Sequence, residues 1–345
     1  MRITLEYAMI ALSGDGNAEI HEQKYMKRRK FVATLLSLAF WPTVARGQRP
    51  KTAVIGILVA GNLDPRRFVS IFKDELQHLG YQEGQNVRFE FRTGEGKMDI
   101  LQGLAAELVQ SRVDIIVTWL TPAVRAAKQA TNQIPIVMAG AGDPVATGVV
   151  ASLVKPGGNI TGMAGLAAEL SGKNVELVRE LLPSAKRLGV LCNTLDSFTK
   201  PFLANVERAA IDTGFELDPI MVNGVDELET SFLRMSKDGV DALIVQPSLQ
   251  TSRAAELALK TNLPAASPIE SFTEDGGLIS YAGRSSDQYR LAAAYVDKIL
   301  RGSRPADLPV QLPTRFDLKI NLKTAKVLGL IVPPSMLGRA DEVVE

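Results

Sequence analysis

Few residues of this 345-residue chain are suited to nucleophilic or metal chemistry, since it contains only two His and one Cys. A zinc site of the Cys₄ or Cys₂His₂ kind and an intramolecular disulfide each need more cysteines. A Ser-His-Asp triad would depend on His78, which the pattern places late in a surface helix. The chain contains no G-x-x-x-x-G-K-[ST] motif, and no G-x-G-x-x-G follows its first expected strand. We therefore expect a binding protein, with no metal and no cofactor.

The residues best placed for binding follow the expected strands, because parallel α/β sheets bind ligands outside the carboxyl ends of their strands. Most of these side chains are small or polar, which suits hydrogen bonds to a small solute. The candidates are Gly61, Asn62, Trp119, Thr121, Gly142, Asp143, Asn193, Ser197, Gln246, Glu270 and Tyr281.

Several candidates have a purely structural alternative. Asp143 and Thr121 each precede a proline, which is typical of a helix cap followed by the first helical residue. The N–H groups of such helices would also suit a ligand carboxylate. Asn193 could simply stabilise a turn, whereas Trp119 has no evident core to fill, which favours a ligand contact. Cys192 ends an apolar strand and is expected to be buried.

Short apolar runs alternate with amphipathic stretches along most of the chain, which predicts an α/β fold with parallel sheets. The expected strands are 53–59, 87–91, 114–118 and 134–138 in the first half, and 188–192, 215–222, 242–245 and 263–266 in the second. The expected helices are 65–79, 100–109, 122–130, 172–182, 201–213, 227–237 and 251–260. A helix at 287–300, a strand at 315–322 and a short helix at 324–328 complete the prediction.

An internal similarity indicates two Rossmann-like lobes. VDIIVTWLTPAVRAAKQATNQIP begins at Val113, and VDALIVQPSLQTSRAAELALKTNLP begins at Val240. Each gives Val-Asp, a strand, a turn with Pro, a helix with Arg-Ala-Ala, and then Asn and Pro. The first lobe is expected to span 51–162 plus 284–306 and the second 163–283 plus 307–345. Crossings near 161–165, 280–283 and 308–313 would form a hinge, because Gly and Pro suit one there.

The N-terminal part resembles a secretory signal. Four basic residues at 27–30 precede an apolar run at 31–44 and a small-x-small site at 45–47. At 1.5 Å per residue that run covers about 21 Å, which is short of a hydrocarbon core about 30 Å thick. We expect cleavage of 26–47 and export by the Sec or twin-arginine route. Because no Cys lies near the site, no lipid anchor is expected, and residues 1–25 are interpreted as a start-site misassignment.

Three segments of the chain resemble a known family. They are LVKPGGNITG, the C-terminal stretch from YRLAAAYVDKILRG through DEVVE, and a signal beginning RRKF and ending WPTVARGQ. They are similar to the substrate-binding proteins of ABC transporters, including tryptophan-type binding proteins. The resemblance covers nearly all of the chain after Met26 and implies a type I periplasmic-binding fold with three crossings, a ligand in the cleft, and a membrane permease and ATPase as partners.

The resemblance also implies site residues. The turn at Gly61-Asn62 corresponds to a ligand loop, and a Gly-Thr-Pro-Ala turn of the family appears as 120–123, with Thr121 as the contact. Gly-Asp-Pro-Val is retained at 142–145, and Ser-Tyr-Gly of the family becomes Ser280-Tyr281-Ala282. This chain departs from the family at Trp119 and Leu120, where small residues are usual, and at 267–269, where relatives often carry an aromatic. Amino-acid specificity is therefore not carried over.

We therefore predict an exported, periplasmic, monomeric solute-binding protein that captures an amino acid or an aromatic or carboxylate compound. With a formal net charge of +1, the chain lacks the basic excess of a nucleic-acid-binding protein. Two alternatives remain open at this point. One is a secreted α/β transferase or isomerase that uses Asp143 and Glu270 as acid and base. The other is a periplasmic ligand sensor.

Overall fold

The computed structural model describes residues 52–61 and 65–345. The expected signal at 26–47, the upstream residues 1–25 and the candidate Asn62 lie outside the described residues.

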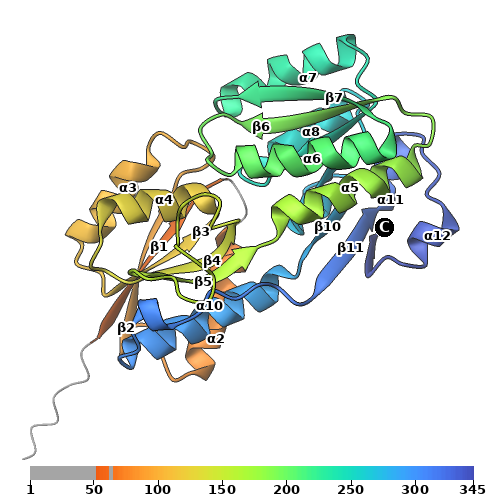
Figure 1. Cartoon of the computed structure of the whole chain (residues 1–345). Helices are drawn as coiled ribbons and strands as arrows, with labels where there is room; N and C mark the ends of the chain where they lie inside the picture. Colours follow the sequence, from red (N-terminus) through yellow and green to blue (C-terminus); the bar gives the residue numbers. More distant parts are fainter. Residues whose placement is uncertain (1–51, 62–64) are drawn as a thin grey trace, which may run out of the picture. The chain divides into compact units, whose positions relative to one another are not determined.

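The first sheet of the described chain has five parallel strands in the order β2-β1-β3-β4-β5 (Figure 1). Every side chain of β3 and β4 is buried, as expected for strands covered on both faces. The elements are β1 (Ala53–Val59), α2 (Pro65–His78), β2 (Val87–Thr93), α3 (Leu101–Gln110), β3 (Ile115–Trp119), α4 (Thr121–Ala130), β4 (Ile136–Gly142) and β5 (Ile160–Gly165).

The second sheet has the order β12-β11-β10-β9-β8-β6-β7. Its neighbouring strands run parallel except for the β10–β11 pair, which is antiparallel. The elements between β5 and the end of β10 are α5 (Ala167–Leu181), β6 (Arg187–Asn193), α6 (Thr199–Thr213), β7 (Glu216–Val222), α7 (Leu228–Lys237), β8 (Ala242–Val245), α8 (Thr251–Lys260), β9 (Ala265–Ser267), α9 (Ser271–Glu274) and β10 (Ile279–Gly283). The remaining ones are α10 (Ser285–Leu300), β11 (Phe316–Asn321), α11 (Leu322–Val327), α12 (Pro334–Leu337) and β12 (Glu342–Val344).

The two sheets repeat one topology, as the internal similarity suggested. Read from its far edge, the second sheet runs β7-β6-β8-β9-β10, which matches β2-β1-β3-β4-β5 of the first. The aspartate of the repeated Val-Asp pair makes the same kind of hydrogen bond in both lobes. A carboxylate oxygen of Asp114 accepts the N–H of Val54 (2.9 Å), and one of Asp241 accepts those of Lys186 and Arg187 (2.6 and 2.8 Å). In each lobe the aspartate fastens the first strand of the unit to the third.

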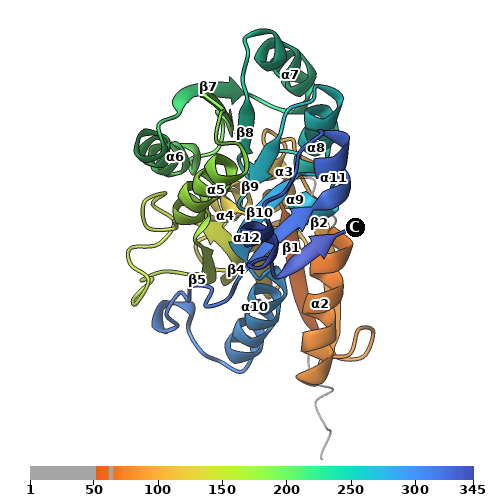
Figure 2. The same ribbon diagram turned by 90° about the vertical axis from the view of Figure 1, so that its right-hand side faces the viewer.

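Apolar side chains form separate clusters on the two faces of each sheet. In the first lobe, α2 and α10 pack together on one face, and α3 and α4 lie on the other. In the second lobe, α5 and α6 cover one face and α7 and α8 the other (Figure 2). The α2–α10 cluster and the α7–α8 cluster are continuous with each other. The α/β fold with two parallel-sheet lobes is thus confirmed.

Most predicted elements match within a few residues, but two predicted crossings differ. Residues 161–165 and 280–283 belong to strands β5 and β10, which pair with β4 and β9. The chain passes between lobes just after each strand, into α5 and α10. The Gly and other small residues of β5 and β10 made their strand pattern weak in the sequence. These two segments are extended because they pair with β4 and β9. Cys192 is fully buried as expected, and burial raises the pKa of its thiol to about 12.

The third passage, at 308–315, is bonded to strand β5 and to the second passage, at Arg284. Gln311 donates its backbone N–H to Gly162 (2.9 Å), and its carbonyl accepts the N–H of Ala164 (2.9 Å). Arg315 accepts the N–H of Arg284 (3.0 Å) at its carbonyl. Two bidentate ion pairs reinforce this last contact, Arg284–Asp317 (2.6 and 2.8 Å) and Arg315–Asp287 (2.5 and 2.7 Å). Strand β5, the third passage and the second passage therefore form one hydrogen-bonded ribbon.

None of the helices among the described residues is long and apolar enough to cross a bilayer.

Substituting Gly162 is expected to destabilise the first lobe beside the ribbon. Its φ is +121°, and a Cβ there would lie 2.3 Å from the carbonyl oxygen of Met138. We expect Gly162→Ala to lower the free energy of unfolding by about 1–3 kcal/mol from backbone strain alone, with the clash adding to the loss. Urea denaturation measures this change. Gly158→Ala, in open space, is the control; equal midpoints for the two variants would refute the explanation.

Candidate binding site between the lobes

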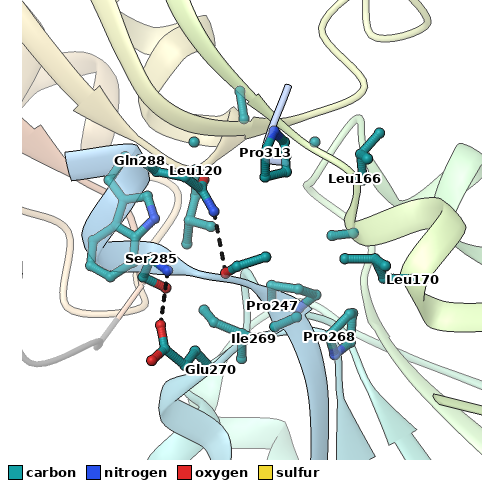
Figure 3. A pocket seen from close by; sticks show the side chains of 18 of the residues that line it. Leu120, Leu166, Leu170, Pro247, Pro268, Ile269, Glu270, Ser285, Gln288 and Pro313 are labelled. Carbon is teal, nitrogen blue, oxygen red and sulfur yellow. Dashed lines mark hydrogen bonds between the residues drawn. The ribbon is translucent and has the colours of Figure 1, made fainter. Parts of the chain in front are cut away.

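A cavity of about 60 Å³ lies where the strands of both sheets end (Figure 3). The first lobe contributes the ends of β3, β4 and β5 and the start of α10, and the second lobe contributes the turns after β8 and β9, the end of β10 and the start of α5. The lining residues are Trp119, Leu120, Gly140, Ala141, Gly142, Gly165, Leu166, Ala167, Leu170, Pro247, Pro268, Ile269, Glu270, Ala282, Gly283, Ser285, Gln288, Tyr289 and Pro313. This is the position at which parallel α/β sheets bind ligands.

Backbone shape at the end of β4 helps to keep this cavity open. The β4–β5 register shifts between Ala139 and Ala141, and Gly140 has φ +150°. A Cβ at Gly140 would lie 2.8 Å from Oε1 of Gln288 and 3.6 Å from Nε1 of Trp119. Bulges of this kind re-aim strands beside binding sites, and here a side chain would fill the space between the two polar groups.

Trp119 lines the cavity, but it is also part of a core. Its ring centroid lies 5.4 Å from that of Phe68 and 5.1 Å from that of Tyr289, and the side chain is almost buried. The expectation that Trp119 has no core to fill is therefore wrong. The cluster was not visible in the sequence because α10, which carries Tyr289, returns to the first lobe from the second half of the chain.

Thr121 and Gly142 bind each other. The Thr121 hydroxyl accepts the Gly142 N–H (3.0 Å) and donates to the Gly142 carbonyl (3.3 Å), which fastens the end of β4 to the start of α4. Thr121 is not a cap, because α4 begins at Thr121 and Leu120 occupies the N-cap position with φ +68°. Gly142 lines the cavity, and a Cβ there would lie 2.4 Å from the ring of Phe198 in the other lobe.

The expected helix after Asp143 is absent from the described structure. Asp143 has φ +21°, and the residues that follow form turns rather than a helix. Its carboxylate accepts the N–H of Ala146 (3.0 Å) within this turn, and Asp143 is not among the residues that line the cavity. The proline that follows it favoured a helix start, but it suits the first position of a turn equally well.

Asn193 and Gln246 belong to a buried polar network in the second lobe. Oε1 of Gln246 accepts the Asn193 N–H (2.7 Å) and the Thr199 hydroxyl (3.0 Å), and its Nε2 donates to Asp196 (3.0 Å). Burial raises the pKa of Asp196. Neither candidate lines the 60 Å³ cavity, and Ser197 lines another hollow beside Arg125 of α4. The network holds the loop after β6 in shape.

Glu270 is the one predicted carboxylate that lines the cavity, and a backbone N–H and two cationic side chains bind it. It accepts the N–H of Ser285 at the start of α10 (2.8 Å) and meets Lys319 Nζ (3.0 Å) and Arg67 Nη2 (3.2 Å). Lys319 also meets Glu274 (3.1 Å) and Glu342 (2.6 Å), and Arg67 meets Glu274 (2.5 Å). Because Arg67 belongs to α2 and the other partners to the second lobe and the passage, this charge cluster joins the two lobes.

The remaining candidates lie away from the cavity lining. Gly61 has φ +83° and faces the carbonyl of Ser248 in the other lobe. The Tyr281 ring stacks on Phe316, and its backbone N–H and carbonyl both bind the Asn174 side chain (3.0 Å each). Of the candidates, Trp119, Gly142 and Glu270 line the cavity.

The sequence reasoning missed several lining residues on the passages. Gln288 and Tyr289 lie in the first turns of α10, Leu166 and Leu170 at the start of α5, and Pro313 in the third passage. The candidates predicted from the sequence lie in turns after strands, whereas these residues lie at the start of the next helix or in the third passage. The predicted crossings could have indicated these residues, because the segments that join two lobes also border the cleft between them. Among the described residues no His, Cys, Asp or Glu group is arranged to hold a metal ion.

Removing Lys319 is expected to leave the buried Glu270 without its main counter-charge. Lys319 is 3% exposed, and breaking a buried pair typically costs about 3–5 kcal/mol. We expect Lys319→Met to lower the free energy of unfolding by this amount in chemical denaturation. Arg304→Met, which breaks the exposed Arg304–Asp307 pair, is the control and should barely move the midpoint. A similar small change for both variants would contradict the assignment.

Acid should weaken the same cluster. Burial acts to raise the pKa of Glu270, but the Ser285 N–H and the charges of Lys319 and Arg67 outweigh it, so the pKa lies below its ordinary value. A carboxyl with a lowered folded-state pKa contributes stability above its unfolded pKa of about 4.3, and this is lost as pH falls through the folded pKa. We expect the unfolding free energy of Glu270→Gln to fall less steeply than wild type below about pH 4.3; parallel curves would exclude this role.

Comparison with known proteins places the chain in a family. The model of the family described as ABC transporter substrate binding protein matches residues 52–344. A curated protein named tyrosine-binding protein, from Clostridioides difficile, is 28% identical over 270 residues, which cover 75% of each chain.

Solved structures agree with this result. A conserved domain protein from Vibrio cholerae has a TM-score of 0.79 and 26% identity, and the match covers 85% of this chain and all of that one. A domain from Streptococcus pneumoniae in complex with L-Trp has a TM-score of 0.78 and 27% identity over the same shares. Because the family model spans nearly all of the described residues, this chain belongs to the family of ABC transporter substrate-binding proteins.

Proposed function

We propose that this protein captures a small organic solute in the cavity between its lobes and delivers it to an ABC permease. The observation that carries the proposal is the composition of the cavity wall, which is built from strand ends of both sheets. Two lobes joined by passages of this kind open and close around a ligand by hinge motion. Ligand affinity for the closed form then drives closure, because binding shifts the population toward the state that binds more tightly.

The relatives indicate which solutes to screen first. One is named for tyrosine and another was solved with L-Trp, which supports the amino-acid and aromatic classes expected from the sequence. No Lys or Arg occurs among the described residues of the cavity wall. A strongly anionic solute such as a phosphate ester would find no counter-charge there.

The location and the partners follow from the same proposal. Cleavage of 26–47 would release a periplasmic monomer without a lipid anchor, exported by the Sec or twin-arginine route. Its partners would be the permease and ATPase subunits in the inner membrane. Family membership favours this function over the secreted-enzyme alternative. In addition, Asp143 is bonded within its own turn and Glu270 within the charge cluster, so neither carboxylate faces the cavity as a free acid or base.

Identification of a co-purified solute by mass spectrometry tests the proposal. Calorimetry with that solute should then give weaker binding to Gly142→Ala, because a Cβ at Gly142 would push against Phe198 and hold the lobes apart. Gly103→Ala, in a helix with open space around it, should bind as wild type does.

Two outcomes would refute the proposal. One is turnover of the solute by the protein, which would identify an enzyme. The other is equal affinity of wild type and Gly142→Ala for a solute that binds, which would place the ligand outside the cleft.

A further inference from the structure

Two polar atoms in the wall of the cavity have no hydrogen-bond partner among the described residues of the chain. One is the indole Nε1 of Trp119, and the other is the amide oxygen Oε1 of Gln288. The amide nitrogen of Gln288 donates to the carbonyl of Gly283 (3.4 Å), a hydrogen bond drawn in Figure 3. Because polar groups that a ligand encloses need a partner, the indole N–H and the amide oxygen point to a polar group on the solute.

Both atoms lie beside Gly140, where β4 has its irregular pairing. A Cβ built on Gly140 would lie 2.8 Å from Oε1 of Gln288 and 3.6 Å from Nε1 of Trp119. A solute oxygen close to this position could therefore accept from the indole N–H and donate to the amide oxygen. Gly140 has φ +150°, a conformation that suits glycine, so no side chain fills this space, which we call the Gly140 notch.

The Gly140 notch belongs to the first lobe alone. Trp119 ends β3, Gly140 lies in β4, and Gln288 lies in α10, which packs against β4 and α2. The indole is held by the rings of Phe68 and Tyr289, whose centroids lie 5.4 and 5.1 Å from its own. Opening of the lobes would leave these contacts in place. The donor and the acceptor are thus preorganised for a ligand.

The hydrogen-bonding capacity of the Gly140 notch matches a hydroxyl group. An indole N–H only donates and an amide oxygen only accepts, whereas a hydroxyl both accepts and donates. A carboxylate would bring a further acceptor against the oxygen of Gln288. An ammonium group would offer no acceptor to the indole N–H of Trp119. A hydroxyl is therefore the simplest group that satisfies both atoms.

The rest of the cavity wall suits an apolar body. Glu270 is the one charged side chain among the described residues of the lining, and Ser285, Lys319 and Arg67 bind it. The larger apolar side chains of the lining are Leu120, Leu166, Leu170, Pro247, Pro268, Ile269 and Pro313. A solute that joins an aromatic or other apolar body to one hydroxyl matches both the notch and this wall.

We propose that Trp119 and Gln288 form a subsite that binds the phenolic hydroxyl of an aromatic solute. The hydroxyl oxygen accepts the indole N–H, and its hydrogen is donated to Oε1 of Gln288. This inference rests on the proposed function, because it concerns the same cavity. Within the aromatic class proposed above, the subsite selects solutes whose ring carries a hydroxyl.

The test compares L-tyrosine with L-phenylalanine, which differ only by the phenolic hydroxyl, in calorimetry on the full chain. Wild type should bind L-tyrosine about tenfold or more tighter, because L-phenylalanine leaves both polar atoms unpaired. Gln288→Leu should remove most of this preference by weakening L-tyrosine binding alone. Trp119→Phe, which keeps a ring but removes the N–H, should also reduce it.

Gln110→Leu is the matched control, because Gln110 is exposed at the end of α3. It should keep the wild-type preference for L-tyrosine. Melting curves confirm that each variant is folded.

The outcomes separate this inference from the proposed function. Equal affinity of wild type for the two probes overturns the inference, and so does wild type that binds neither. A folded Gln288→Leu that loses affinity for both probes equally also overturns it, because the residue would then act on the scaffold. In each of these cases a co-purified solute would leave solute capture intact. Turnover of a solute would instead refute the proposed function, and the comparison of the two probes would still decide whether the notch binds a hydroxyl.

Discussion

The buried carboxylate of Glu270 is the interaction on which the arrangement of the cleft depends. It accepts the N–H that begins α10 and meets Lys319 of β11 and Arg67 of α2. A buried charge is tolerated only when its oxygens keep such partners. This one carboxylate therefore connects the wall of the cavity, the second passage, the last part of the second sheet and one helix of the first lobe. A movement of α2 away from the second lobe would break the Arg67 contact.

The hydrogen-bonded ribbon of β5 and the second and third passages connects the two lobes. The third passage is bonded to Gly162 of β5 on one side and to Arg284 on the other. The two Arg–Asp pairs add bidentate contacts at the same place. Sliding of these segments past one another would break both sets of contacts.

The alternation of elements could be predicted because strands buried on both faces and amphipathic helices leave strong patterns. Strands β5 and β10 could not be, since ITGMAG and ISYAG become extended only through pairing with β4 and β9. The site was harder for the same reason. The turns after several strands were predicted, but β4 continues through Gly142, four residues beyond the predicted end of that strand. The sequence also did not show that Thr121 binds Gly142, or that Gln246 holds the loop after β6. Polar residues beside a cleft can bind the scaffold instead of a ligand, as Thr121 and Gln246 do, and the sequence pattern is the same for both roles.

The repeated topology allows the two walls of the cleft to be compared position by position. With Val113 matched to Val240, Trp119 corresponds to Gln246, so the two lobes carry different residues at one position of the repeat. In the second lobe the amide binds the backbone and hydroxyl of the neighbouring loop. In the described part of the first lobe, Thr121, two residues after Trp119, fastens β4, and Trp119 lines the cavity. The repeated scaffold thus carries an asymmetric site, because this position holds an indole at the cavity in the first lobe and an amide of the loop network in the second.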